Sequence, residues 1–128
     1  MILYIDTTKN DQVTIVVKDG NREVATKVFS APHQQAERLL PEIDKLLKIK
    51  KIKLQDLKKI EIENSGGSFT SLRIGVATAN ALGYALGIPV VGFGGETKIV
   101  KNKDNQEFSV VEPIYDREPN ITVKKLAS

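Results

Sequence analysis

Residues 57–93 read LKKIEIENSGGSFTSLRIGVATANALGYALGIPVVGF, and this stretch decides the fold. Leu57, Ile60 and Ile62 mark one strand, and the apolar run from Ile88 to Phe93 marks another. Between them, residues 70–86 predict a long helix that ends at Gly87. A strand, a helix and a strand in this order predict two parallel strands joined by a right-handed crossover.

The residues before this unit predict three more strands and one more helix. The apolar run Ile2 to Ile5 predicts a central strand that ends at Asp6, and residues 12–29 alternate around the turn Asp19-Gly20 as a hairpin does. A helix over residues 33–49 follows from apolar residues spaced by three and four. These residues are Leu39, Leu40, Ile43, Leu46 and Leu47.

The predicted fold class is therefore α/β, with a mixed five-stranded sheet and helices packed on it. The order strand, strand, strand, helix, strand, helix, strand is characteristic of the ribonuclease H-like core, the lobe from which actin-like ATPases are built. We predict that residues 1–95 form this lobe and that residues 96–128 form a short hairpin and an extended tail. A chain of 128 residues fits one domain.

Composition excludes several kinds of site. The chain has no cysteine and one histidine, so it has no disulfide scaffold, thiolate-ligated zinc, cysteine nucleophile or two-histidine metal motif. No basic leader precedes Asp6, so we expect a cytoplasmic location. The uncharged stretch 74–95 contains Asn80, Pro89 and six glycines, and we expect a helix and a strand there instead of a membrane span.

The loop Ser65-Gly66-Gly67-Ser68 and Asp6 are the candidate ligand-binding elements. Free amides at a helix N-terminus could hold an anion, but a tight turn with Ser68 or Thr70 as the helix cap explains the same residues. Asp6 has three interpretations: a phosphate-loop carboxylate, a metal ligand, or a hydrogen-bond acceptor for Thr7 or Thr8. A two-metal nuclease site would need Asp6 together with Glu61 or Glu63, and Asp116.

Three other features each have two interpretations. Gly75, Ala79 and Gly83, with Ala77, Ala81 and Ala85, give the 70–86 helix small faces that pack on its own sheet or on a partner helix. His33 is interpreted as a surface or capping residue, with a ligand or a general base as the alternative. A basic segment could contact RNA phosphates, or could complement a helix dipole and aid solubility. Its lysines are Lys45, Lys48, Lys50, Lys51, Lys53, Lys58 and Lys59, against Asp56 alone.

Several segments resemble the TsaB (YeaZ) family. They are Met1 to Thr7, the run Glu37-Arg38-Leu39-Leu40-Pro41-Glu42-Ile43-Asp44, Gly67-Ser68-Phe69-Thr70-Ser71-Leu72-Arg73-Ile74-Gly75, and Ala81 to Gly92. The resemblance implies a non-catalytic, actin-like subunit of the bacterial machinery that makes threonylcarbamoyladenosine in tRNA. It implies partners as well: a TsaD-like catalytic subunit, a TsaE-like ATPase, a possible homodimer, and tRNA indirectly.

In that family the helices equivalent to 33–49 and 70–86 form the partner interface. The resemblance therefore places the interface at His33, Leu40, Ser68, Phe69, Thr70, Leu72, Arg73, Gly75, Val76, Ala79 and Gly83. It implies no catalytic residue, no metal and no cofactor of its own. ATP or ADP would be shared with a partner, with Asp6, Thr7 and Gly67 as candidates for contacting it.

The length departs from the family pattern. Members usually carry a second lobe after the strand equivalent to Ile88 to Phe93, and here about twenty residues separate Gly95 from the family-like ending that runs from Pro113 to Pro119. We expect that most of the second lobe is missing from the middle. The alternative functions are a metal-dependent ribonuclease H-like nuclease and a self-associating module without an enzymatic role.

Overall fold

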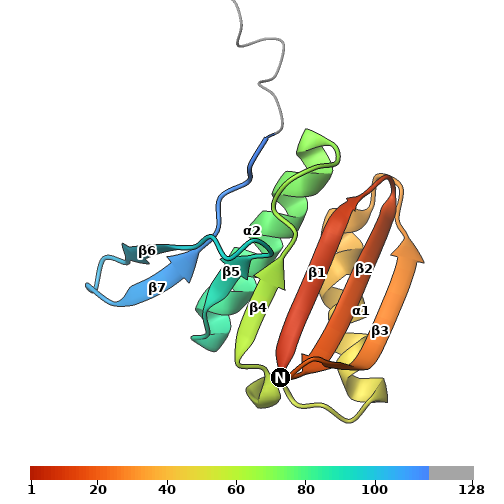
Figure 1. Cartoon of the computed structure of the whole chain (residues 1–128), viewed down its shortest axis with the longest axis horizontal. Helices are drawn as coiled ribbons and strands as arrows, with labels where there is room; N and C mark the ends of the chain where they lie inside the picture. The colour runs from red at the N-terminus through yellow and green to blue at the C-terminus, as the bar shows by residue number, and fades with distance from the viewer. Residues whose placement is uncertain (116–128) are drawn as a thin grey trace, which may run out of the picture.

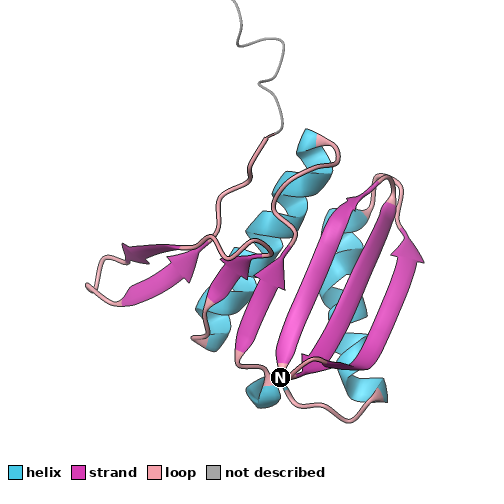
Figure 2. Cartoon of the chain, in the orientation of Figure 1, coloured by secondary structure: helices cyan, strands magenta, loops and turns pink. Residues whose placement is uncertain are grey.

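Five strands form one mixed sheet, and two helices cover one of its faces (Figures 1 and 2). The structure, a computed structural model, describes residues 1–115. The spatial order of the strands is β3-β2-β1-β4-β5. β1 (Ile2–Lys9), β2 (Gln12–Asp19) and β3 (Arg22–Ser30) are antiparallel, whereas β4 (Lys59–Ile62) is parallel to β1 and β5 (Val90–Gly92) is parallel to β4. The predicted α/β class is confirmed.

Both helices connect neighbouring parts of this sheet. α1 (Gln35–Ile49) and the short 3-10 helix η1 (Leu54–Asp56) lead from β3 to β4, and α2 (Phe69–Leu86) leads from β4 to β5. Figure 1 shows α1 and α2 side by side behind the sheet. The core therefore lies between the helices and the covered face of the sheet.

Alternation along the strands determines which side chains enter this core. Leu3 pairs with Val17 on one side and with Ile60 on the other, and all three side chains are fully buried. Ile5 and its strand partners repeat this pattern two residues later. Aliphatic residues on the inner faces of the helices complete the core: Leu39, Ile43, Leu46, Leu47, Leu72 and Val76.

The first strand is longer than the sequence predicts. Asp6 pairs with Thr14 and Lys9 pairs with Gln12, so β1 continues three residues beyond Asp6. The turn into β2 includes Asn10, whose φ of 58° is left-handed, a conformation that asparagine tolerates. The prediction that the strand ends at Asp6 is therefore wrong, because antiparallel pairing with β2 extends it.

Two other boundaries differ for local reasons. α1 begins at Gln35 and not at residue 33, because His33 has a left-handed φ of 61° that helical backbone excludes. β4 begins at Lys59, because Leu57 ends η1 before the strand starts. Leu57 is nevertheless 1% exposed, so its apolar character reports burial and not strand structure.

A hairpin of β6 (Lys98–Lys101) and β7 (Glu107–Val110) lies beside β5 (Figure 1). Residues of β7 and the two residues just before β6 cover the outer edge of β5. Ser109 Oγ accepts a hydrogen bond from the Val90 N–H at 2.7 Å, and Thr97 Oγ1 donates to the Val90 carbonyl at 2.7 Å. The Gly92 N–H donates to the carbonyl of Glu96 at 2.7 Å. The outward backbone groups of β5 are therefore already paired.

Two asparagines hold the segment that follows the hairpin. Asn80 of α2 accepts from the Val111 N–H at 2.8 Å and donates to the Val111 carbonyl at 2.9 Å. The side-chain amide of Asn64 donates to the Glu112 carbonyl at 3.0 Å, and the backbone carbonyl of Asn64 accepts from the Ile114 N–H at 2.7 Å. Residues 111–114 are thus fixed across α2 and the end of β4. Residues 116–119 of the family-like ending, Asp116 among them, lie outside the described residues, and the predicted division at residue 95 stays a prediction.

Candidate functional site

Asp6 and the two threonines after it form a buried polar cluster in β1. Asp6 Oδ1 accepts hydrogen bonds from the backbone N–H of Thr8 at 2.8 Å and from its hydroxyl at 2.6 Å. The hydroxyl of Thr7 donates to the carbonyl of Ser71 in α2 at 2.7 Å. Of the three interpretations of Asp6, this geometry supports the local hydrogen-bond acceptor, with Thr8 as its partner.

The glycine-rich loop lies against the same cluster. Gly66 and Gly67 both have positive φ, 88° and 75°. A Cβ atom on Gly67 would lie 2.8 Å from the Cα of Thr8, so only glycine allows the loop to approach β1 this closely. The three candidates for contacting a nucleotide, Asp6, Thr7 and Gly67, are therefore brought together around Thr8.

Ser68 caps α2, as one interpretation of the loop predicts. Its Oγ accepts a hydrogen bond from the Ser71 N–H at 3.0 Å and lies 2.9 Å from the Ser71 hydroxyl. Its φ and ψ of −78° and 154° are those of an N-cap residue. Thr70, the other capping candidate, lies inside the first turn of α2.

Ser68→Ala should therefore destabilise the chain by about 1 kcal/mol, because one amide of the first turn loses its acceptor. Ser68→Gly should cost only a few tenths of a kcal/mol, since glycine also suits the N-cap position. The measurement is urea unfolding followed by circular dichroism. Thr70→Ala is the control and should change stability little; a larger loss for Thr70→Ala than for Ser68→Ala would contradict the assignment.

A cavity of about 470 Å³ lies beside this first turn. Two aromatic rings form part of its lining, with Phe69 and Tyr115 in edge-to-face contact at 4.9 Å between centroids. Arg73 Nε donates to the Tyr115 hydroxyl at 3.0 Å. The complete lining is Gly66, Gly67, Ser68, Phe69, Leu72, Ile114 and Tyr115. The segment fixed by Asn64 thus supplies one wall.

The glycine face of α2 packs on this chain's own sheet. A Cβ atom on Gly75 would collide with the hydroxyl of Thr7, and one on Gly83 would collide with Val90 and lie 3.2 Å from the carbonyl of Ile88. Five residues of the expected partner interface are therefore buried within this chain, and their place in an interface stays a prediction. They are Leu72, Gly75, Val76, Ala79 and Gly83.

The other expected interface residues lie on the accessible side. Leu40 was predicted in the apolar core stripe as well, but its side chain is 49% exposed. Phe69 is half-buried, and His33, Ser68, Thr70 and Arg73 are exposed. The outward face of α2 carries a second row of small residues, Ala77, Ala81 and Ala85, all of them exposed. The spacing of four residues showed this row in the sequence, but not which row faces outward.

His33 lies before α1 and lines a second cavity, of about 420 Å³, at the N-terminal ends of both helices. Gln35, which sequence reasoning missed, also lines it; its side chain is 5% exposed and its Nε2 has no hydrogen-bond partner among the described residues. No sequence pattern signals a buried glutamine at a helix start. The complete lining is Asp11, His33, Gln35, Ser68, Thr70, Ser71 and Ile74.

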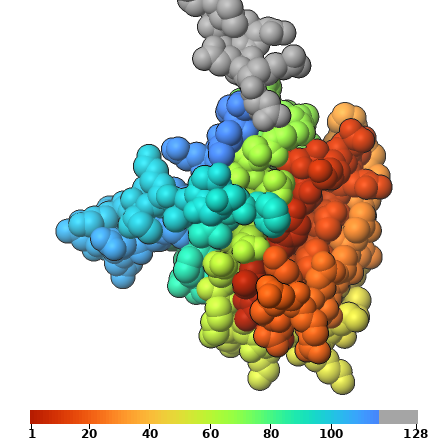
Figure 3. Space-filling model, in the orientation of Figure 1, coloured from red at the N-terminus to blue at the C-terminus, as the bar shows by residue number. Residues whose placement is uncertain are grey.

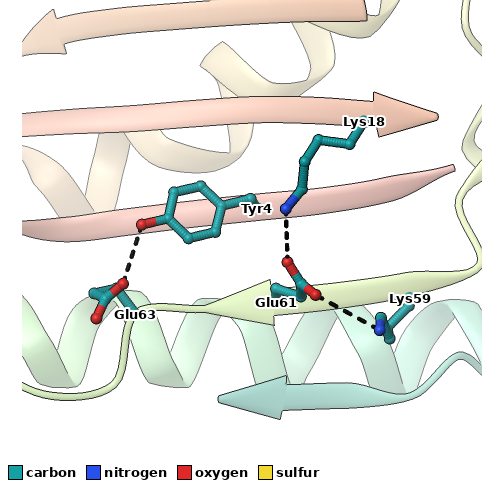
Figure 4. A network of polar contacts seen from close by, with 5 residues as sticks. All are labelled: Tyr4, Lys18, Lys59, Glu61 and Glu63. Carbon is teal, nitrogen blue, oxygen red and sulfur yellow. Dashed lines mark hydrogen bonds and ion pairs between the residues drawn. The ribbon is translucent and has the colours of Figure 1, made fainter. Parts of the chain in front are cut away.

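Glu61 and Glu63, two carboxylates of the nuclease interpretation, bind different side chains (Figure 4). Glu61 pairs with Lys18 at 3.0 Å and with Lys59 at 3.6 Å, while Glu63 accepts from the Tyr4 hydroxyl at 3.1 Å. Burial raises the pKa of Tyr4 well above its usual value, and the nearby carboxylates of Asp6, Glu63 and Glu61 raise it further. Within residues 1–115 no three metal-ligating side chains come together, and Asp116 lies outside the described part.

The open face of the sheet carries this network. Figure 3 shows β1, β2 and β3 on the near side of the molecule with no helix in front of them. Phe93, which follows β5, is 57% exposed and contacts the ring of Tyr4 edge to face at 5.4 Å. Neither helix of the described part is long and apolar enough to cross a bilayer.

Comparison with known proteins gives consistent matches. The family model described as "TsaD: tRNA N6-adenosine threonylcarbamoyltransferase" matches residues 27–94. The tRNA threonylcarbamoyladenosine biosynthesis protein TsaB of Bacillus subtilis is 29% identical over 115 residues, which cover 90% of this chain and 49% of the relative. The solved structure of YeaZ from Pseudomonas aeruginosa has a TM-score of 0.64 and 26% identity, covering 71% of this chain and 42% of YeaZ.

The match extends to the transferase branch. The tRNA N6-adenosine threonylcarbamoyltransferase of Brachyspira hyodysenteriae is 30% identical over 105 residues, 70% of this chain and 31% of that enzyme. The chain spans about half the length of the TsaB relative that it matches. Sequence, fold and family model agree with the resemblance carried by residues 67–75, and the chain belongs to the TsaB (YeaZ) family.

Proposed function

We propose that this chain is a non-catalytic partner subunit of the machinery that forms threonylcarbamoyladenosine in tRNA. Its relatives carry the name of that pathway, and the transferase model matches the region that contains both helices. In this proposal the chain binds a TsaD-like catalytic subunit, a TsaE-like ATPase joins the pair, and tRNA is bound by the assembly. A catalytic role is disfavoured because the resemblance implies a subunit without catalytic residues, and the single histidine of the sequence is too few for a two-histidine metal motif.

The outer surface of the two helices carries the proposal. Leu40 of α1 is 49% exposed, and Ile74 of α2 is half-buried on the side away from the sheet. Ala77 and Ala81 are exposed one turn apart on α2. Apolar side chains next to small residues allow a partner helix to approach closely and to bury the exposed leucine. The interface thus uses the outward row of alanines instead of the buried glycine row.

ATP or ADP in this proposal binds at the boundary with the partner. The 470 Å³ cavity is open on one side and has the Gly66-Gly67 loop and the first turn of α2 in its wall. Two glycines and free amides at a helix N-terminus suit a phosphate group. Ile114 and Tyr115 form another wall of the cavity, and in this proposal the remaining contacts with the nucleotide come from the partner.

Ala81→Glu tests the interface. Placing an unpaired carboxylate between the helices should weaken the complex with the TsaD-like subunit by at least about tenfold. The measurement is co-purification after co-expression, followed by titration calorimetry. Melting temperature should not change, because Ala81 is exposed in the free chain.

Val28→Glu is the matched control, since Val28 is 52% exposed on β3, a strand of the sheet and not part of either helix. It should bind the TsaD-like subunit as the unchanged chain does. Absence of any complex with the unchanged chain, or equal binding by the Ala81→Glu variant, would contradict the proposal. A stable homodimer that does not exchange with the TsaD-like subunit would favour the self-associating module.

A further inference from the structure

One end of the molecule concentrates most of its positive charge. We call it the basic end, and it comprises Lys45, Lys48, Lys50, Lys51, Lys53, Lys58 and Lys59. These residues belong to the last part of α1, the connection through η1, and the start of β4. In Figure 1 this connection runs along the lower edge of the molecule, next to the N-terminus. All the lysines are exposed except Lys59, which is half-buried.

Neighbouring carboxylates neutralise little of this charge. Seven lysines and one aspartate give residues 45–59 a net charge of +6, in a chain whose total is +3. Lys48 pairs with Asp44 at 2.9 Å, and Lys59 pairs with Glu61 at 3.6 Å. The other five lysines form no ion pair with a carboxylate of residues 1–115. The Asp56 carboxylate instead accepts a hydrogen bond from the backbone N–H of Lys53 at 2.9 Å.

The helix dipole does not account for the cluster. Lys48 is the basic residue in the last turn of α1, and the helix ends at Ile49. Lys50, Lys53 and Lys58 lie beyond that end, and the stabilising effect of the dipole is confined to the last turn. Like charges that are not neutralised repel one another, so the cluster does not stabilise the fold by itself.

Lys51 occupies a backbone position that favours glycine. Its φ is 58°, and it follows α1 where the Lys51 N–H donates to the Lys48 carbonyl at 3.1 Å and the Ile52 N–H donates to the Leu47 carbonyl at 2.9 Å. Helices commonly end in this way with a glycine in the left-handed conformation. The backbone conformation therefore does not explain a lysine at this position. The exposed charge is the property that distinguishes Lys51 from the glycine that the position favours.

We propose that the basic end binds the phosphate backbone of a structured RNA. Flexible lysines that project from one surface without carboxylate partners suit phosphates as point charges. Residues 45–59 contain no aromatic side chain, so they offer no surface for base stacking, and the contact should not depend on base sequence. The choice of RNA rests on the proposed function, whose substrate class is tRNA.

An anionic membrane fits the same surface less well. A membrane-binding helix places its apolar face in the lipid, and that face of α1 is buried under the sheet through Leu39, Ile43 and Leu46. Within residues 45–59, the exposed apolar side chains are Ile49 and Leu54, and no aromatic side chain is present to anchor in the headgroup region.

The test is a titration of the full chain into fluorescently labelled, unmodified tRNA, followed by anisotropy at several salt concentrations. Five unpaired lysines should give a slope of log affinity against log salt of about −3 to −4. The triple variant Lys50→Gln, Lys51→Gly, Lys53→Gln should bind about tenfold more weakly at about 100 mM salt and reduce the slope by about two. Lys51→Gly alone should keep or raise the melting temperature, because glycine adopts the left-handed conformation without strain.

The control variant Lys98→Gln, Lys101→Gln, Lys103→Gln removes the same charge from the exposed positions of the β6-β7 hairpin. It should bind tRNA as the unchanged chain does. Equal losses in the two triple variants would overturn the proposal, as would no binding of tRNA by the unchanged chain at about 50 mM salt. Binding to vesicles with 30% phosphatidylserine but not to tRNA would overturn it in favour of a membrane.

The outcomes separate this inference from the proposed function. The variant of the basic end should still co-purify with the TsaD-like subunit, because its substituted lysines follow α1 and lie outside both helices, whereas Ala77 and Ala81 lie on α2. RNA binding without a TsaD-like complex would contradict the proposed function alone. A TsaD-like complex with unchanged RNA binding in the variant of the basic end would contradict the inference alone.

Discussion

Gly83→Leu should destabilise the fold instead of weakening association with a partner. The position lies on the buried side of α2, where a Cβ atom would collide with Val90 and lie 3.2 Å from the carbonyl of Ile88. Val90 is fully buried in β5, so it has no free volume into which to move. We expect a loss of about 3 kcal/mol in the free energy of unfolding, despite the better helix propensity of leucine.

The measurement is thermal and urea unfolding followed by circular dichroism, and the melting temperature should fall by about 10 °C. Ala81→Leu, two residues earlier on the exposed side of the same helix, is the control and should leave stability nearly unchanged. If Gly83→Leu kept the original stability and lost only partner binding, the glycine row would be the interface after all.

Asn80→Ala should have the second largest effect on stability. The Asn80 amide is hydrogen-bonded to both the N–H and the carbonyl of Val111, and Val111 is 3% exposed. Truncation leaves two buried backbone groups without partners, each at a cost of about 1–3 kcal/mol when no water replaces the lost contact. We expect a total loss of about 2–3 kcal/mol, in keeping with the partial burial of Asn80.

Hydrogen exchange locates this effect. The Val111 amide should exchange much faster in the Asn80→Ala variant, while the amides of β1 should lose protection only in proportion to the global change. Asn80→Asp is a second variant: it keeps an acceptor for the Val111 N–H but sets a carboxylate oxygen against the Val111 carbonyl, so it should be at least as destabilised as Asn80→Ala. Unchanged exchange at Val111 in Asn80→Ala would show that the asparagine does not hold this segment.

Repeating patterns made the sheet and its helices predictable. Alternation in residues 12–29 predicted the hairpin, and the apolar spacing of Leu39, Ile43, Leu46 and Leu47 reports burial directly. The alternation did not identify the buried face of β3, where Ala25 and Phe29 enter the core and Val28 is 52% exposed. The end of β1 could not be predicted in the same way. Whether a strand stops at Asp6 depends on pairing with β2, a contact that the local sequence of β1 does not contain.

The candidate site was predictable in its parts but not in their arrangement. The Gly66-Gly67 loop, Asp6 and the Ser68 cap are local signals, and the structure brings them together around Thr8. Spacing identified two small-residue rows on α2, but an alanine row and a glycine row look alike without the sheet that covers one of them. The roles of Asn64 and Asn80 depend on partners 48 and 31 residues away, and neither residue has a local pattern.

The paired outer edge of β5 limits how copies of this chain can join strand to strand. A filament that grows by edge-to-edge addition needs two free edges on every subunit, because each added subunit must present a second free edge to the next one. Here the side chains of Ser109 and Thr97 and the carbonyl of Glu96 occupy the backbone groups at the β5 edge, which leaves β3 as the free edge of the described sheet. Two copies that pair through β3 use up the free edge of the five-stranded sheet in both, so strand addition along this sheet closes at a dimer.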